Sequence, residues 1–417
     1  MNFNLNLMEL SVQTSPAFSP VKIGPITVKN RFIKAAANEN MSRNGLPTAA
    51  MLKHHGDLAR GGVGLTTVAY IAVSELGRTL PDQIWARREA LPALQKLTAE
   101  VHAAGGKVCA QITHGGAFVT SIKLDKRPFT SSGGLNKAGM LAGNWLSRDM
   151  TAADMQMVQE EFVACAELMR EAGFDAVELH MGHGYLLNQF VSPLSNKRKD
   201  QYGGSAENRI RYPAQVLAAV KKAVGQDLAV LAKINVWDGV RGGATAEDGI
   251  VTARALQAAG ADMLVLSGGR NVESLHVLFG SSPNLPELKK VLHDQPLTRT
   301  AIVLQNLIAP KVAFTPLYFW PHSLKIRQAV PDLPMAYLGG VKSLAQVEQC
   351  LGAGFEAVAM ARVLLHDAAF VNHLQSGQVQ ESACDNCNAC VAYIYHPDGT
   401  RCVHLPPNDP ALNREPI

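Results

Sequence analysis

No run of 18 apolar residues occurs in the 417-residue sequence, so no membrane-spanning helix is expected. An excess of charge of one sign is also lacking, since the formal net charge is only +4 and the basic residues are scattered. Neither a nucleic acid nor a membrane is therefore expected as a partner. The opening residues do not have the basic start and apolar run of a signal peptide.

Cysteine is too sparse and too unevenly placed for a disulfide framework. The chain has seven cysteines, an odd number, and four of them lie close together near the C-terminus. A disulfide network is unusual in a long chain without a signal peptide, so a cytoplasmic location is the expectation. Cys109, Cys165 and Cys350 look like ordinary core residues.

A repeated pattern of helix, glycine and short apolar run organises the chain. Gly173, Gly260 and Gly354 each end a helical stretch and precede the runs AVELH, MLVLS and AVAMA. A glycine here allows the left-handed conformation that closes many helices, and the apolar runs suit strands buried on both faces. Strands that alternate with helices indicate parallel pairing.

Eight strands of this kind can be recognised: RFIKAA, GLTTVAY, KVCAQIT, AVELHM, AVLAKINV, MLVLSGG, MAYLGGV and AVAMAR. Helices are expected near residues 48–60, 89–104, 151–172, 206–223, 245–259, 324–330, 343–352 and 363–375. This alternation predicts an α/β protein with a closed TIM (β/α)8 barrel. A doubly wound open sheet is the alternative.

The barrel is expected over residues 18–377, between a flexible N-terminal arm (1–17) and a C-terminal tail (378–417) that contains the clustered cysteines. Two connections, 115–150 after the third strand and 270–322 after the sixth, are too long to be plain turns. Both follow strands, on the face where such barrels carry their chemistry.

The ends of the seventh and eighth strands predict a phosphate site. The seventh strand ends in Gly339-Gly340 and the eighth in Ala361-Arg362. Backbone N–H groups at a glycine turn together with a guanidinium bind anions well, and barrels often place a phosphate after these two strands. The alternative is that the two glycines only form a tight turn.

Lys233 and Gln111 lie within or at the end of apolar strands. An unpaired lysine is costly to bury, so Lys233 either reaches the surface or faces a group that becomes anionic during turnover. Gln111 offers both a donor and an acceptor, which suits the imide-like edge of a ring. A core glutamine bonded to backbone is its alternative.

His180, His183 and Tyr185 follow the fourth strand. Two imidazoles could bind a metal, donate hydrogen bonds to one oxygen, or form a structural pair, although no third metal ligand lies nearby in sequence. A tyrosine with a pKa of about 10 is protonated at neutral pH and can act as an acid. A core tyrosine is the alternative for Tyr185.

The region from Phe18 to Arg362 resembles the old yellow enzyme family of NAD(P)H:flavin oxidoreductases. The matching stretches are PVKIGPITVKNRFIKAA, QITHGG, residues 180–212 (HMGHGYLLNQFVSPLSNKRKDQYGGSAENRIRY), the GG of the seventh strand and the AR of the eighth. The resemblance implies bound FMN and NAD(P)H as the hydride donor. By motif position it implies that Gln111 and Lys233 hold the flavin pyrimidine edge, that Gly340 and Arg362 hold its phosphate, and that Ala36, Ala37 and Asn38 line its ring. Gly339 and Ala361, which precede the two phosphate residues, are further expected cofactor-binding residues. His180 and His183 would hold a substrate oxygen, and Tyr185 would act as the proton donor.

Three features depart from the family pattern. Many members have arginine where Lys233 stands, and lysine lacks the planar fork of arginine. The first strand ends in AAANE instead of the more usual Pro, Met and then Thr or Cys. We also expect no dinucleotide domain after the tail, unlike in larger relatives such as 2,4-dienoyl-CoA reductase and trimethylamine dehydrogenase.

Cys384, Cys387, Cys390 and Cys402 have the spacing of a metal site. They resemble the four cysteines that hold a [4Fe–4S] cluster in those larger relatives. The alternatives are a structural zinc ion and unligated thiols.

We therefore expect an FMN-dependent ene-reductase that transfers hydride from NAD(P)H to an activated C=C bond of an α,β-unsaturated carbonyl compound. The alternatives are a flavin-dependent amine dehydrogenase, demethylase or ring-desaturating enzyme, a non-redox phosphate-binding aldolase or isomerase with Lys233 as nucleophile, and a binding protein. Expected partners are an unsaturated small molecule and a nicotinamide nucleotide, with further copies of the chain as another candidate.

Overall fold

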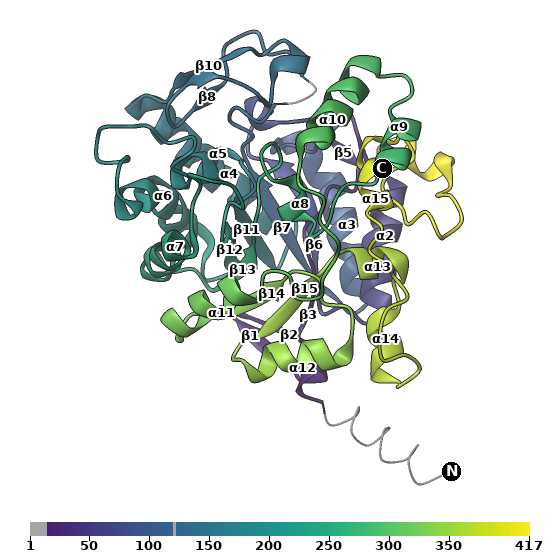
Figure 1. The fold of residues 1–417 in the computed structure, drawn as a ribbon. Helices are drawn as coiled ribbons and strands as arrows, with labels where there is room; N and C mark the ends of the chain where they lie inside the picture. Colours follow the sequence, from purple (N-terminus) through teal and green to yellow (C-terminus); the bar gives the residue numbers. More distant parts are fainter. Residues whose placement is uncertain (1–14, 120–121) are drawn as a thin grey trace, which may run out of the picture.

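The computed structural model describes residues 15–119 and 122–417, and its centre is the closed parallel barrel predicted from the sequence (Figure 1). Most of the N-terminal arm expected over residues 1–17 lies outside the described residues. The barrel strands, in order around the barrel, are β3 (Phe32–Lys34), β6 (Leu65–Ala72), β7 (Lys107–Thr113), β11 (Ala176–Met181), β12 (Ala229–Asn235), β13 (Met263–Ser267), β14 (Met335–Leu338) and β15 (Ala357–Met360). All eight predicted strands are confirmed.

At the amino-terminal ends of its strands, the barrel is filled by side chains. β11 and β12 are buried along their whole length, as expected for strands covered on both faces. A hairpin of β1 (Val21–Ile23) and β2 (Ile26–Val28) packs its apolar residues against the interior layer of the barrel and closes this end. The chemistry of the barrel is therefore confined to the opposite end, where the strands have their carboxyl termini.

The helices that cover the barrel begin and end close to their predicted positions. They are α2 (Ala49–Arg60), α3 (Leu91–Ala103), α4 (Ala152–Glu171), α6 (Ala206–Val224), α7 (Ala246–Ala258), α11 (Trp320–Ala329), α12 (Leu344–Gly352), α13 (Arg362–His366) and α14 (Phe370–Gln375). Capping boxes of Thr151 with Asp154 and of Thr245 with Asp248 fix the starts of α4 and α7. None of the described helices is long and apolar enough to cross a membrane.

One predicted helix is wrong as a single element. The stretch expected over 363–375 is divided into α13 and α14. Asp367 interrupts it, because its carboxylate accepts hydrogen bonds from the backbone N–H of Ala369 at 2.9 Å and from His373 Nδ1 at 2.8 Å. Such side-chain bonds to nearby backbone compete with the continuous helix.

Three insertions rise above the carboxyl ends of the strands (Figure 1). The loop after β7 contains β8 (Phe129–Thr130), β9 (Gly134–Leu135) and β10 (Leu146–Asp149). The loop after β11 contains α5 (Leu186–Val191), and the loop after β13 contains α8 (Leu275–Leu278), α9 (Leu285–Val291) and α10 (Pro296–Ile308). The two long connections therefore form structured walls around the barrel mouth.

The C-terminal tail packs against the loop that follows β3. The tail contains α15 (Ala389–Ala392), and the loop runs into the small hairpin of β4 (Ser42–Arg43) and β5 (Leu46–Pro47). The backbone N–H of Thr400 donates to the carbonyl of Glu39 at 2.7 Å, and Asn40 Nδ2 donates to the carbonyl of His396 at 2.8 Å. The tail thus returns to the barrel mouth and holds one of its loops.

Candidate active site

Gln111 and Lys233 meet inside the barrel at one carboxylate, that of Glu178. Gln111 Nε2 donates to Glu178 Oε1 at 2.7 Å, and Lys233 Nζ lies 3.2 Å from the same oxygen. Lys233 is only 1 % exposed, so the interpretation of a lysine that reaches the surface is wrong. Lys233 Nζ also lies 3.4 Å from the carbonyl of Ala36, and this contact joins the cation to the loop after β3.

A second buried ion pair, which the sequence analysis missed, lies beside the first. Lys34 at the end of β3 pairs with Glu39, and Lys34 Nζ also donates to the carbonyl of Thr67 at 3.0 Å. Burial lowers the pKa of Lys34 and raises that of Glu39, while their mutual attraction opposes both shifts. The signal in the sequence was the pair of charges on either side of AAAN, directly at a strand end.

His180, His183 and Tyr185 lie side by side above β11. The ring of His180 is 4.9 Å from that of His183 and 4.3 Å from that of Tyr185, centre to centre. Burial lowers the pKa of both imidazoles and raises that of the phenol well above its usual value. All three side chains are therefore neutral near pH 7, which leaves them free to donate hydrogen bonds.

The two histidines are held in place by neighbouring polar groups. His183 Nε2 lies 2.7 Å from Ser267 Oγ, and its backbone N–H donates to Asn235 Oδ1 at 3.1 Å. His180 Nδ1 accepts from the backbone N–H of Gly182 at 3.3 Å, so the ring proton of neutral His180 is on Nε2. Among residues 15–119 and 122–417, no third ligand completes a metal site with this pair.

Aromatic residues from β6, the loop after β7 and the tail surround Tyr185, and no sequence pattern predicted them. The rings of Tyr70 and Phe118 lie 5.3 Å and 5.1 Å from that of Tyr185. The tail adds Tyr395, whose pKa is raised to about 12, mainly by burial and also by interaction with Tyr70. Only the pairing of distant strands and loops brings these rings together, so no local pattern could have revealed them.

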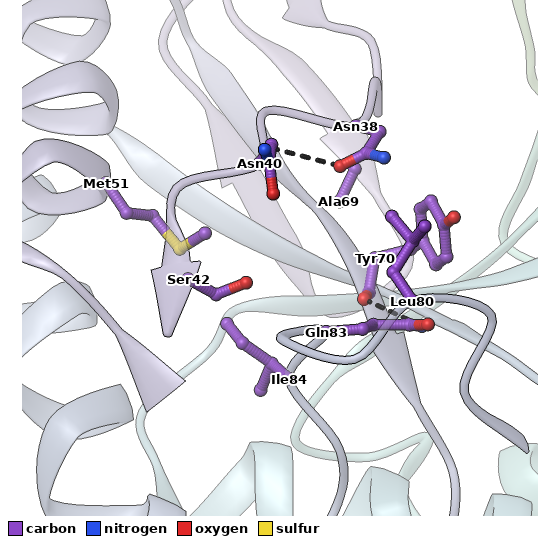
Figure 2. A pocket seen from close by; sticks show the side chains of 9 residues that line it. All are labelled: Asn38, Asn40, Ser42, Met51, Ala69, Tyr70, Leu80, Gln83 and Ile84. Atoms are coloured by element: carbon purple, nitrogen blue, oxygen red, sulfur yellow. Dashed lines mark hydrogen bonds between the residues drawn. The ribbon is translucent and has the colours of Figure 1, made fainter. Parts of the chain in front are cut away.

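A small cavity lies beside Tyr70, between the loops that follow β3 and β6 (Figure 2). Asn38 and Asn40 line it from one side, and Tyr70 and Gln83 line it from the other. The side-chain oxygen of Asn38 accepts from the backbone N–H of Asn40 at 3.0 Å. Of the three residues predicted to line a flavin ring, Asn38 borders this cavity, while Ala36 and Ala37 do not.

Gly339, Gly340 and Arg362 lie on adjacent strand ends, because β14 pairs with β15. Both glycines have positive φ, 144° and 81°, a conformation that favours glycine. A Cβ atom on Gly340 would lie 2.9 Å from the ring of Tyr318, which leaves no room for a side chain. Arg362 lies over the ring of Phe314, with 5.4 Å from its guanidinium carbon to the ring centre.

Arg362 also connects the glycine turn to the tail. Its guanidinium donates to Asn388 Oδ1, and Asn388 stands between two of the clustered cysteines in the sequence. A hydrogen bond with Arg362 opposes the burial that raises the pKa of Tyr318. Ala361, the residue before α13, forms its N-cap.

The four tail cysteines are free thiols grouped around Arg362. Burial raises the pKa of Cys390 to about 12, and interaction with Arg362 opposes the rise. No three of the four Sγ atoms lie within 4.8 Å of one another in the described part of the chain; the group that does converge is Asp385, Cys387 and His404. Within it, His404 Nε2 lies 3.1 Å from Asp385 Oδ2 and 3.9 Å from Cys387 Sγ.

Comparison with known proteins gives consistent matches. Residues 16–300 match the model of the NADH:flavin oxidoreductase / NADH oxidase family. The chain is 37 % identical over 392 residues to 4,4'-dithiodibutanoate disulfide reductase of Rhodococcus erythropolis, covering 94 % of this chain and 95 % of that protein. Among solved structures, it resembles histamine dehydrogenase of Rhizobium sp. 4-9 (TM-score 0.77, 19 % identity, 96 % of this chain and 53 % of that one). It also resembles the old yellow enzyme homologue of Zymomonas mobilis (TM-score 0.70, 18 % identity, 97 % and 100 %).

Proposed function

This chain belongs to the NADH:flavin oxidoreductase / NADH oxidase family, and we propose that it reduces an activated C=C bond in a small α,β-unsaturated carbonyl compound. Membership makes it an oxidoreductase that works with FMN and NAD(P)H, and it excludes the aldolase or isomerase interpretation of the barrel. The observation that carries the finer proposal is the group of three neutral donors, His180, His183 and Tyr185, at the barrel mouth.

The buried donors fit FMN at the barrel mouth. Lys233 and Gln111 supply an ammonium and an amide side by side, which suit the pyrimidine edge of a flavin. The side-chain-free turn at Gly339 and Gly340 with the neighbouring Arg362 suits its phosphate. Bound FMN supplies the transfer of hydride from NAD(P)H to a substrate carbon.

The residues beside this site have the properties that the second substrate requires. Nε2–H of His180 and the ring of His183 can both donate to a carbonyl oxygen, which would withdraw electrons from the conjugated C=C bond. Tyr185 keeps its proton at neutral pH and can release it to the carbon next to that carbonyl. Expulsion of water by the surrounding aromatic rings would strengthen these hydrogen bonds.

We further propose that Cys384, Cys387, Cys390 and Cys402 hold a [4Fe–4S] cluster. A single zinc ion needs its thiolates about 2.3 Å from the metal and hence close together, whereas no three of these Sγ atoms in the described chain converge within 4.8 Å. A cluster of four irons accepts a wider spacing. A single ion bound by Asp385, Cys387 and His404 is the competing outcome, and zinc without iron in the purified protein would favour it.

A second substrate class is supported by one comparison. The relative from Rhodococcus erythropolis, which aligns over almost its whole length, is a disulfide reductase by name. Reduction of a small organic disulfide needs electrons at sulfur but no proton at carbon. The Tyr185→Phe variant therefore separates the two substrate classes.

The deciding experiment compares an enone, a small organic disulfide and an amine as substrates of the purified enzyme under anaerobic conditions. We expect NAD(P)H-dependent loss of the enone, and we expect Tyr185→Phe to slow it about 10²- to 10⁴-fold, the range of general acid catalysis. Disulfide reduction that Tyr185→Phe leaves unchanged, with no enone turnover in the wild type, would replace the proposal by the second class. Oxidation of the amine alone would indicate that the flavin works in the opposite direction.

A further inference from the structure

Arg270, in the loop after β13, is a buried cation beside the donors of the candidate active site. It is 5 % exposed, and its backbone forms an isolated parallel bridge with His183. The next backbone N–H, that of Asn271, donates to the carbonyl of His183 at 3.1 Å. These contacts fix Arg270 beside the turn that carries His183 and Tyr185.

The guanidinium of Arg270 uses two of its three nitrogens for contacts with the protein. Nε donates to Glu273 Oε2 at 2.9 Å, and Nη1 donates to Asn188 Oδ1 at 3.1 Å. The same amide oxygen of Asn188 accepts from the backbone N–H of Gly184 at 2.9 Å. Nη2 makes no hydrogen bond within residues 15–119 and 122–417, so its two N–H groups are available to another acceptor.

This free nitrogen faces open space at Gly184. A Cβ atom placed on the glycine would lie 3.8 Å from Nη2 and 3.9 Å from the guanidinium carbon of Arg270. Its chain neighbours aside, that atom would meet nothing else within 4 Å in the described structure. Gly184 has a φ of 92°, which disfavours any residue with a side chain. The space in front of Nη2 therefore stays open, one residue away from both His183 and Tyr185.

The carboxylates near Arg270 leave part of its binding capacity unused. Glu273 contacts Nε alone, and its side chain is 30 % exposed, so water competes for this pair and weakens it. The buried carboxylate of Asp238 already accepts three hydrogen bonds from other groups, and it forms no ion pair with Arg270 in the described part of the chain. An acceptor with its own negative charge would complete the bonds of the guanidinium.

We propose that Arg270 binds a carboxylate of the substrate, so that the enzyme acts on unsaturated ketones that carry an anionic arm. The ketone oxygen lies on His180 and His183, and the carboxylate lies on Nη2 of Arg270, next to Gly184. Consecutive Cα atoms are about 3.8 Å apart, so an arm of a few carbons spans the two positions. This inference rests on the proposed function, because the histidines must hold the carbonyl group.

A carboxylate suits this position better than a neutral group or a phosphate. Its hydrogen bonds to a guanidinium are about twice as strong as those between neutral groups, and arginine keeps its charge at neutral pH. A phosphate would bring about two negative charges next to Glu273, whereas a carboxylate brings one. The contact is the same before and during hydride transfer, so it strengthens binding and leaves the chemical step unchanged.

The first measurement uses a ligand that cannot be reduced at a C=C bond. Levulinate, a saturated ketone with a carboxylate arm, and its methyl ester are titrated into the FMN-loaded full chain, and calorimetry and the flavin spectrum report binding. We expect levulinate to bind more tightly than the ester. Arg270→Gln should weaken levulinate binding about 10- to 100-fold, the size of one lost hydrogen bond to a charged group, and leave the affinity for the ester nearly unchanged.

Two further variants support this comparison. Arg241→Gln removes an exposed charge from the loop after β12 and should leave both affinities near those of the wild type. Glu273→Gln removes the carboxylate that competes for the guanidinium, so levulinate should bind several-fold more tightly while the affinity for the ester stays the same. If Arg270 only supports its loop, the loss of either member of the pair should weaken both ligands together. Because Glu273 is partly exposed, its variant remains informative if Arg270→Gln does not fold.

Turnover separates this inference from the proposed function. The substrates are a vinyl ketone with a carboxylate on a short saturated arm and the methyl ester of the same compound. Arg270→Gln should raise KM for the acid and leave kcat nearly unchanged, since the lost contact is equal in the ground and transition states. The ester should be reduced equally well by the variant and the wild type.

Equal affinity of the wild type for levulinate and its ester, equal losses for both in Arg270→Gln, or weaker levulinate binding in Glu273→Gln would overturn the inference. If the preference for the acid depends on Arg270 in an enzyme that reduces no enone, the carboxylate site stands and the proposed function fails. If the neutral enone is reduced and the acid is not preferred, the proposed function stands and the inference fails.

Discussion

At the scale of single residues, two buried ammonium groups share one barrel, and each has its own carboxylate. Lys233 pairs with Glu178, and Lys34 pairs with Glu39. Removing one member of such a pair leaves a buried charge without a partner. The free-energy cost of that charge is far larger than the net stabilisation that the intact pair provides. A substitution that keeps the charge, compared with one that removes it, therefore shows whether the charge or the exact side-chain geometry matters.

We predict that Lys233→Met weakens FMN binding and lowers the free energy of unfolding by about 3–5 kcal/mol, because Glu178 is left buried without its cation. Lys233→Arg keeps the charge and should retain most of both properties. Fluorescence titration with FMN and urea unfolding measure the two effects. Retention of FMN affinity by the methionine variant would show that Lys233 serves the core alone.

Buried His114 provides a prediction about pH. Burial lowers its pKa to about 3, whereas an unfolded histidine titrates near pH 6.5. Between these two pH values, His114 binds a proton in the unfolded state but not in the folded state. The contribution of neutral His114 to stability is therefore fully present above about pH 6.5, and it is lost as the pH falls, by about 1.4 kcal/mol per pH unit.

We expect the unfolding free energy of His114→Gln to decrease less steeply than that of the wild type between pH 6.5 and 5. The comparison of urea unfolding at several pH values isolates this residue, since all other titrating groups are common to both proteins. Parallel curves would mean that His114 gains its proton in the folded state. The variant itself should be somewhat less stable at pH 7, because His114 stacks on Phe129 at 5.1 Å.

At the scale of elements, one nearly inaccessible side chain, Asn413, adds several hydrogen bonds to the contact between the tail and the loop after β3. Its Nδ2 donates to the carbonyls of Asn40 at 3.1 Å and Pro397 at 2.8 Å, and its Oδ1 accepts from Thr48 Oγ1 at 2.9 Å. This single residue therefore ties three segments together.

We predict that Asn413→Ala destabilises the protein by about 1–3 kcal/mol, the cost of leaving buried partners unsatisfied, and speeds amide hydrogen exchange in residues 38–43. Mass-spectrometric hydrogen exchange measures this effect. Arg414→Ala, an exposed neighbour, is the control and should leave exchange in that loop unchanged. Faster exchange across the whole chain would point to global destabilisation instead.

The elements that the sequence predicted are those whose signal is local. A buried parallel strand appears as a short apolar run, and Gly173 or Gly260 at the preceding helix end marks where it begins. The break at Asp367 depends on side-chain hydrogen bonds to Ala369 and His373, which no periodic pattern reveals. The small strands β8 to β10 depend on one another across a long loop. The ion pair of Lys233 with Glu178 was missed for the same reason, since only the register of β11 against β12 brings the two together.

At the scale of the whole molecule, one end of the barrel is closed by the hairpin of β1 and β2, and the other is surrounded by three insertions and the tail (Figure 1). Residues predicted from separate strand ends therefore come together at one mouth. The assembly of several copies of the chain stays a prediction, which sedimentation at several concentrations can test.

The proposed cluster is tested on the complete, anaerobically purified protein. We expect about four irons per chain, with broad absorbance beneath the flavin bands, and we expect Cys390→Ala to lose the iron. Cys165→Ala, which changes a buried cysteine of α4, should retain it. Zinc in place of iron would favour the site of Asp385, Cys387 and His404, and absence of both metals would leave free thiols.

The hydrogen bond from Arg362 to Asn388 has a practical consequence for anyone who trims this protein. A diagram of the barrel suggests that the chain could be cut after α14 to give a smaller and simpler catalyst. Such a shortened version would lose the acceptor that orients Arg362, the side chain at the expected phosphate position. It would also expose the loop after β3, whose carbonyls at Glu39 and Asn40 would lose the donors that the tail supplies. Screens for activity or yellow colour should therefore use the full-length chain, because a colourless truncated protein would be a false negative.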